Sequence, residues 1–123
     1  MYEKLLTKQE ERVMELFWKS SIPLTSKDIL AKLCDESWTG SYVYSVLRSL
    51  EKKEMIAECG LVPHKTQSMR AFFARVSKEE FYVRLAYANH IDALEFVKLA
   101  ILVAIQENPK EKMSILQAIT KII

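Results

Sequence analysis

The amino-acid sequence predicts a mainly α-helical protein with one small β-hairpin. Glycine and proline, which interrupt helices, are scarce at 2 and 3 residues. Apolar side chains recur at helical spacing along most of the chain, and the pattern changes to alternation within residues 55–76. A chain of 123 residues can bury one core but is too short for two full-sized domains. We therefore expect one domain over residues 1–76 and a helical appendage over residues 77–123.

Capping signals mark the first two helices. Residues 7–10, TKQE, form a capping box, and the apolar positions that follow carry a helix to about Ser20. Residues 25–28, TSKD, provide a second N-cap for a short helix that closes near Asp35. Each of these helices has one apolar face for a core.

A third helix is predicted to follow the break at residues 38–40, WTG, with Thr39 or Gly40 as its N-cap. Its apolar residues fall at i, i+3, i+4 and i+7, on one face: Val43, Val46, Leu47 and Leu50. The opposite face carries hydroxyls, phenols and cations: Ser41, Tyr42, Tyr44, Ser45, Arg48, Ser49 and Lys52. Such a face is most often solvated surface, so its place in the fold decides whether it binds anything.

Beyond the third helix the spacing becomes that of strands. Residues 55–61, MIAECGL, and 70–76, RAFFARV, each suit a strand, and residues 62–69 form a polar tip between them. The sequence therefore predicts a β-hairpin. Three helices followed by a hairpin, with a polar outer face on the third helix, are typical of the winged helix-turn-helix.

Residues 77–123 are predicted to form three more helices. Residues 77–80, SKEE, form a capping box, and residues 108–111, NPKE, combine an N-cap with an N1 proline. Between them the run LAILVAI, residues 99–105, is apolar on all sides and needs to be buried, yet the tail is too short to wrap it alone. We therefore expect a homodimer with these interface residues: Phe81, Leu85, Phe96, Leu99, Leu102, Val103, Leu116 and Ile119.

The charge balance neither requires nor excludes a nucleic acid. The formal net charge is +2, and the excess lies in residues 1–76, which carry 12 basic and 10 acidic residues against 6 and 6 in residues 77–123. A local basic face is therefore possible, without the strong overall field that would itself indicate nucleic-acid binding.

Several classes of protein are not expected. No stretch approaches the roughly 18 apolar residues of a membrane span, and residues 1–11 lack the apolar centre of a signal peptide, so we expect a cytoplasmic protein with no membrane partner. Cys34, Cys59, His64 and His90 have no metal-ligand spacing, which favours free thiols and no metal. No phosphate loop, nucleophile elbow or metalloprotease helix occurs, so we expect no enzyme, no cofactor and no small-molecule substrate.

In a winged helix, the polar face of the third helix becomes a candidate DNA-reading surface. We expect Thr39 and Ser41 to hold the helix start on phosphate. The residues expected to read base edges in the major groove are Tyr42, Tyr44, Ser45 and Arg48. The cations expected to contact the DNA backbone are Lys52, Lys53, Lys65, Arg70 and Arg75.

The alternative is a winged-helix protein-interaction module, such as a co-regulator or anti-repressor, with weak or no DNA binding. In that case Tyr42 and Tyr44 would anchor a protein partner. An affinity that falls steeply with salt would favour DNA, and an affinity indifferent to salt would favour a protein.

Four segments in order resemble the penicillinase and methicillin-resistance repressor family of bacterial winged-helix regulators: LTKQEERVMELFW, LTSKDIL, WTGSYVYSVLRSLEKKEMI and RAFFARVSKEEF. The resemblance implies a dimeric repressor that binds a near-palindromic operator through its N-terminal domain, with intertwined C-terminal helices. Members of that family are induced by cleavage at an Asn-Phe bond or by copper at Cys-x-Cys motifs, and this sequence contains neither. It also has Ser41, Tyr44 and Ser49 where the resistance repressors carry basic residues, which implies a different operator or weaker or lost DNA binding.

Overall fold

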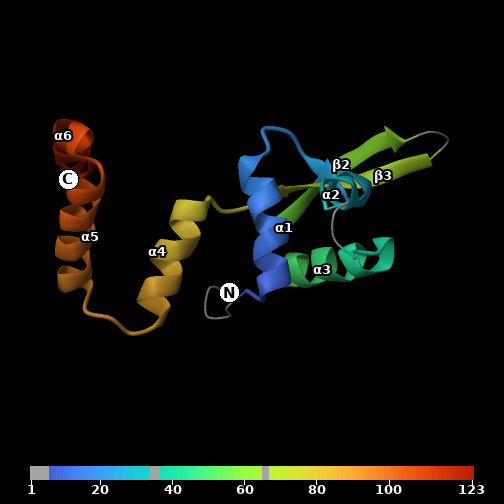
Figure 1. The fold of residues 1–123 in the computed structure, drawn as a ribbon, viewed down its shortest axis with the longest axis horizontal. Coiled ribbons are helices and arrows are strands. Elements are labelled where there is room, and N and C mark those ends of the chain that lie inside the picture. The colour runs from blue at the N-terminus through green and yellow to red at the C-terminus, as the bar shows by residue number, and fades with distance from the viewer. Residues whose placement is uncertain (1–5, 34–36, 65–66) are drawn as a thin grey trace. The chain divides into compact units, whose positions relative to one another are not determined.

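The computed structural model describes residues 6–33, 37–64 and 67–123, with the backbone alone at 64 and 67 (Figure 1). The elements are α1 (Lys8–Lys19), β1 (Leu24–Thr25), α2 (Ser26–Lys32), α3 (Gly40–Lys52), β2 (Ile56–His64), β3 (Gln67–Ala74), α4 (Lys78–Ala88), α5 (Ala93–Glu107), the 3-10 helix η1 (Pro109–Glu111) and α6 (Lys112–Ile122). The chain divides into two compact units, the first ending at Leu85 and the second beginning at Ala86. The first unit thus extends past residue 76, where the sequence suggested a boundary.

Threonines start the first three helices. Thr7 accepts a hydrogen bond from the Glu10 N–H, and Thr25 accepts one from the Asp28 N–H, both at 3.1 Å. In each box the acid also accepts a bond from the N–H of the threonine, and Thr39 caps α3 with a single bond of 3.1 Å. These bonds satisfy amide donors that the first turn of a helix leaves free. The capping predictions for these helices are confirmed.

The first unit contains a three-stranded antiparallel sheet with the strand order β1-β3-β2. β2 and β3 form the predicted hairpin, and both strands run on into residues that were expected to form its tip. The short strand β1 was not predicted, because two residues cannot show alternation. Its Leu24 and Thr25 pair with Phe72 and Ala71 of β3, which joins the hairpin to the helices.

A β-bulge interrupts the pairing of β2 with β3. Glu58 lies opposite Phe72, whereas Gly60 lies opposite Ala71, so Cys59 is the extra residue. Gly60 has a φ of 133°, a backbone conformation that favours glycine. Cys59 is exposed and free; Cys34 lies outside the described residues.

Apolar faces of the helices and the sheet meet in one core. The predicted stripe of α3 is buried, with exposed fractions of 0–5%. The core consists of Val13, Met14, Phe17, Leu24, Ile29, Leu33, Val43, Val46, Leu47, Leu50, Met55, Ile56, Phe72, Val76 and Phe81. Packing in this core therefore fixes α3 against α1, α2 and the sheet.

Two aromatic residues hold the start of α4 in the first unit. The Trp18 indole N–H donates to the Val76 carbonyl oxygen at 3.0 Å, and the Trp18 ring centroid lies 5.9 Å from that of Phe81. Phe81 is 1% exposed, and Leu85 packs against the same core. Phe81 was expected at a dimer interface. A side chain enclosed by its own subunit has no area to offer another, so we remove it from that set.

The second unit contains helices without a core of their own. No residue of α5 or α6 is buried within the chain. Asp92 caps α5 by accepting a hydrogen bond from the Glu95 N–H at 2.9 Å. The Tyr87 ring lies 5.1 Å from the Phe96 ring, centroid to centroid. Local bonds define these helices, but their apolar side chains are left partly or fully in solvent.

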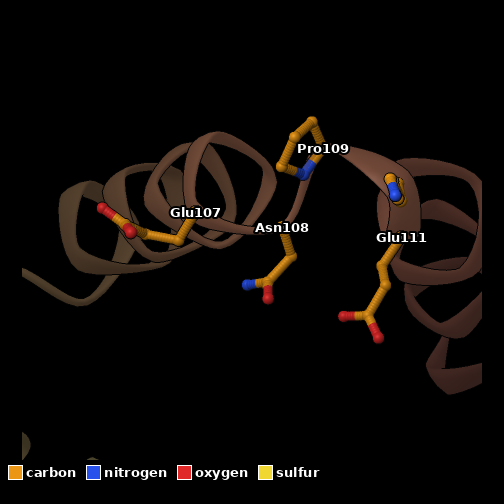
Figure 2. A pocket seen from close by; sticks show the side chains of 5 residues that line it. Glu107, Asn108, Pro109 and Glu111 are labelled. Carbon is orange, nitrogen blue, oxygen red and sulfur yellow. The ribbon is translucent and has the colours of Figure 1, made fainter.

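The turn between α5 and α6 differs from the sequence expectation. Asn108 makes no side-chain capping bond to the last helix; its Nδ2 donates back to the Ala104 carbonyl oxygen at 3.0 Å. η1 follows, and α6 begins at Lys112. Figure 2 shows Asn108 and Glu111 on one side of the turn and Pro109 on the other. Five consecutive residues, 107–111, line the shallow hollow here, so it is the surface of a bend in the chain.

A buried carboxylate ties α1 to the end of α3. Glu10 is 3% exposed, the Ser49 hydroxyl donates to its Oε2 at 2.5 Å, and Lys53 Nζ lies 2.6 Å from its Oε1. Burial alone would raise the pKa of Glu10, but the hydrogen bonds from Lys53, Ser49 and the Thr7 backbone outweigh burial and lower it. The folded protein therefore favours the ionised carboxylate.

Replacing Glu10 by Gln should lower the free energy of unfolding by about 1–3 kcal/mol, because Lys53 loses a charged, hydrogen-bonded partner. The pKa of Glu10 is depressed by folding, so its contribution is present above the ordinary value of 4.5 and is lost as the pH falls through the folded-state value. Urea unfolding at about pH 7 and about pH 3 measures the gap in the free energy of unfolding between wild type and variant, with Glu11→Gln as an exposed control. A gap of the same size at both pH values would contradict this role.

Candidate nucleic-acid interface

The outer face of α3 is open to solvent. Tyr42 and Tyr44 have exposed fractions of 44% and 50%, and Ser41, Ser45 and Arg48 are exposed beside them. This orientation follows from helical spacing, because the buried stripe occupies the other side of the helix. The residues predicted to read base edges therefore share one accessible face.

The N-terminal end of α3 collects hydroxyls and free amides. The Thr39 and Ser41 hydroxyl oxygens lie 3.4 Å apart, and both side chains are exposed. The first N–H groups of a helix point toward its start and carry partial positive charge. Such an end suits a phosphate oxygen, and the contact of Thr39 and Ser41 with phosphate stays a prediction.

Trp38 fixes the position of Tyr42. The two ring centroids lie 5.0 Å apart with a tilt of 50°, and Trp38 is half-buried. Tilted aromatic pairs at this distance are mutually attractive. The Tyr42 ring is therefore supported at the start of the helix while it stays partly exposed.

Tyr44 and Arg48 lie one turn apart and contact each other. The Arg48 guanidinium carbon is 6.0 Å from the Tyr44 ring centroid, at the outer limit of a cation–π contact. Arg48 also borders a shallow groove together with Ser45, Ser49 and Lys52. Arg48 is exposed, and a guanidinium has the paired donors that suit a guanine edge.

Most of the cations assigned to the DNA backbone already have carboxylate partners. Lys53 is paired with Glu10, as described above, and Arg75 lies 3.6 Å from Glu54. Arg70 has two acidic neighbours, at 2.9 and 3.0 Å. Lys65 lies outside the described residues. Lys52 is exposed and has no ion pair with any residue of 6–33, 37–64 or 67–123, so it fits a phosphate contact best.

A hollow of about 260 Å³ lies between α3, the start of α2 and β3. Its lining combines hydroxyls and a cation with an apolar floor: Ser26, Tyr44, Leu47, Ser68, Met69, Arg70 and Phe72. Sequence reasoning missed Ser26 and Ser68. In the sequence, each is only a serine on an element that flanks the third helix. No pattern in the sequence indicates that Ser26 and Ser68 lie close together.

The remaining dimerisation candidates lie in the second unit or at its border. Leu99, Leu102, Val103 and Leu116 have exposed fractions of 39–50%, and Phe96 and Ile119 are half-buried. Leu85 is half-buried against the first unit. The second unit thus leaves large apolar side chains accessible on both of its long helices.

Other kinds of site are not evident among the described residues. No group of three or more histidine, cysteine, aspartate or glutamate side chains in residues 6–33, 37–64 and 67–123 could hold a metal ion. Within the same part of the chain, none of the helices has the length and apolar character needed to cross a bilayer.

Three helices, a hairpin wing and a solvent-facing third helix define a winged-helix protein. The penicillinase repressor family matches residues 6–120, and the chain belongs to this family. The match extends through both units and confirms the resemblance noted in four segments of the sequence. It is a family of repressors, not of enzymes.

Among solved structures, the chain is similar to a mutant of MepR from a multidrug-resistant S. aureus clinical isolate. The TM-score is 0.44 and the sequence identity 20%, covering 94% of this chain and 78% of that chain. A comparison with curated proteins found no match. At this level of similarity, no residue role passes from MepR to this chain.

Replacing Thr39 by Ala should lower the free energy of unfolding by about 1 kcal/mol, because the Tyr42 N–H loses its side-chain acceptor. Thr39→Ser keeps a hydroxyl at the cap and is the matched control, with stability close to wild type. Urea unfolding followed by circular dichroism measures both variants. Equal losses for Ala and Ser would show that the cap bond does not stabilise α3.

Proposed function

We propose that this protein is a homodimeric, DNA-binding transcriptional repressor that recognises a near-palindromic operator through α3 and the β2–β3 wing. The observation that carries the proposal is the exposed polar face of α3 in a chain of the penicillinase repressor family. A repressor of this kind works in the bacterial cytoplasm, where the chromosome lies.

In this proposal α3 enters the major groove with its N-terminal end toward the DNA. Thr39 and Ser41 meet phosphate oxygens, which positions the helix without reading sequence. Arg48 pairs with a guanine edge, and Tyr42 and Tyr44 donate their hydroxyls or pack their rings against thymine methyls. Lys52, at the other end of the helix, contacts the backbone.

Dimerisation through α5 and α6 supports the proposal on physical grounds. Leu99, Leu102 and Val103 are about half exposed in the single chain. Contiguous apolar surface of this kind marks an interface, and burying one such side chain contributes about 1.5–3 kcal/mol. A symmetric pair would present two copies of α3 to two half-sites, which is why a near-palindrome is expected.

A protein-interaction module is the second candidate function. It is favoured by Trp38, Tyr42 and Tyr44, since aromatic side chains dominate the energetics of protein interfaces. The dependence of binding on salt separates the two candidates, because a protein that contacts phosphates releases counterions from DNA.

The reading role of Tyr44 can be tested by selecting binding sites from random DNA with wild type, Tyr44→Ala and Tyr44→Arg. The Ala variant should relax sequence preference and lose about 1–3 kcal/mol of discrimination at one position of the site. The Arg variant should move the preference toward operators of the basic relatives. Neither change should unfold the protein, because Tyr44 is half exposed and lies outside the buried stripe.

Tyr82→Ala is the control for this selection, since Tyr82 is a tyrosine of similar exposure on α4. Its selected sites should equal those of wild type. Identical site preferences for all four proteins would remove Tyr44 from the reading face, and the protein-interaction function would then be the better account.

The dimer can be tested with a charge placed on α5. Leu102→Glu should raise the dimer dissociation constant at least about tenfold, because each subunit would bury an unpaired carboxylate in place of an apolar side chain. Sedimentation of the full-length protein at micromolar concentration measures this. Ile22→Glu, at an exposed position in the first unit, is the control and should leave association unchanged. A monomeric wild type would contradict the proposal.

A further inference from the structure

Arg70 contacts three elements of the first unit at once. Its Nη2 lies 2.9 Å from Glu51 Oε2 on α3 and 3.0 Å from Glu58 Oε2 on β2. Its guanidinium carbon also lies 4.9 Å from the ring centroid of Phe72, two residues further along β3. One side chain on the wing is thereby bonded to the reading helix and to the opposite strand.

The charges around Arg70 make it a poor phosphate ligand. One positive charge is flanked by two carboxylates, so the cluster carries a formal charge of −1. The hydrogen bond that Arg70 donates to Glu58 and the nearby charges of both acids raise the pKa of Arg70 above its ordinary value. A phosphate that approached this cluster would meet net negative charge and would have to compete with bonds already formed.

The position of Arg70 in the sheet explains what these bonds do. β1 pairs with β3 at Phe72 and Ala71, so the three-stranded part of the sheet ends beside Arg70. From Arg70 toward the tip, the described pairs join only β2 and β3. A two-stranded ribbon is weakly constrained by itself, and its direction is open to change.

We infer that Arg70 is a positioning residue that locks the direction of the wing relative to α3, and that it does not contact the DNA backbone. This inference rests on the proposed DNA-binding function. The guanidinium joins the wing to α3 at the first position where the third strand no longer supports it. Phe72, which is buried, gives the guanidinium a rigid surface on which to lie. Arg70 therefore contributes to sequence specificity by aligning two contact surfaces with each other.

Arg70 is expected to position the wing and Lys52 to contact phosphate, so substitutions of these two cations form a matched pair of variants. Lys52→Gln should weaken binding to a selected site and to unrelated DNA equally, and should lower the slope of log affinity against log salt by about one unit. Arg70→Gln should leave that slope unchanged. It should instead lower the ratio of the two affinities by about tenfold, because the direction of the wing relative to α3 is no longer fixed.

The carboxylate partners provide the complementary variant. Glu51→Gln combined with Glu58→Gln should lower the same ratio as Arg70→Gln does, and adding Arg70→Gln to this pair should lower it no further. If Arg70 instead binds phosphate, removing the two acids should strengthen binding to all DNA and keep the ratio constant. Either that result or a unit loss of salt slope in Arg70→Gln overturns the inference.

A measurement without DNA separates this inference from the proposed function. Backbone amide relaxation of the free protein should show greater mobility at residues 61–64 and 67–70 in Arg70→Gln than in wild type. Ion pairs of this exposure add little to overall stability, so the variant should remain folded. Unchanged mobility refutes the positioning role. If wild type shows no salt-dependent DNA binding, the proposed function is refuted. The mobility comparison still tests whether Arg70 positions the wing.

Discussion

The burial of one apolar stripe on α3 determines what this helix presents to solvent. Val43, Val46, Leu47 and Leu50 are nearly fully enclosed by the core. Turning the helix by a single position would expose some of them and force Tyr44 inward, at a cost of about 1.5–3 kcal/mol for each large side chain. The orientation of the candidate reading face is thus held by residues of the buried core. Substitutions on that face can change its chemistry while the helix keeps its orientation.

Helices with local start signals could be predicted from the sequence, since capping threonines act within four residues of chain. Elements that depend on tertiary contacts could not. The strand β1 exists because β3 offers it a pairing edge, and Phe81 joins the first core because Trp18 lies against it. Both facts concern residues far apart in the chain. The apolar periodicity of α4 predicted a buried face correctly but carried no information on which unit would bury it.

The polar residues of the candidate interface could be predicted from the sequence, but the ion pairs of its cations could not. The face of α3 follows from helical spacing, which the sequence displays directly. Glu51 lies 19 residues from Arg70 and Glu10 lies 43 residues from Lys53, so no local pattern indicates these pairs. Carboxylates lie within 4 Å of Lys53, Arg70 and Arg75, which are three of the five cations expected on the DNA backbone. Affinity for DNA in such a protein depends on a small number of positions, and a count of lysine and arginine overstates the attraction.

The bulge at Cys59 adds one residue to β2 without changing how β2 pairs with β3 toward the tip. Because the extra residue is absorbed between Glu58 and Gly60, Leu61 still lies opposite Arg70, as it would in a ladder one residue shorter. Removing the extra residue here would therefore leave the pairs from Gly60 to the tip unchanged. The same insertion placed nearer the tip would shift the alternation by one and turn every later side chain to the other face.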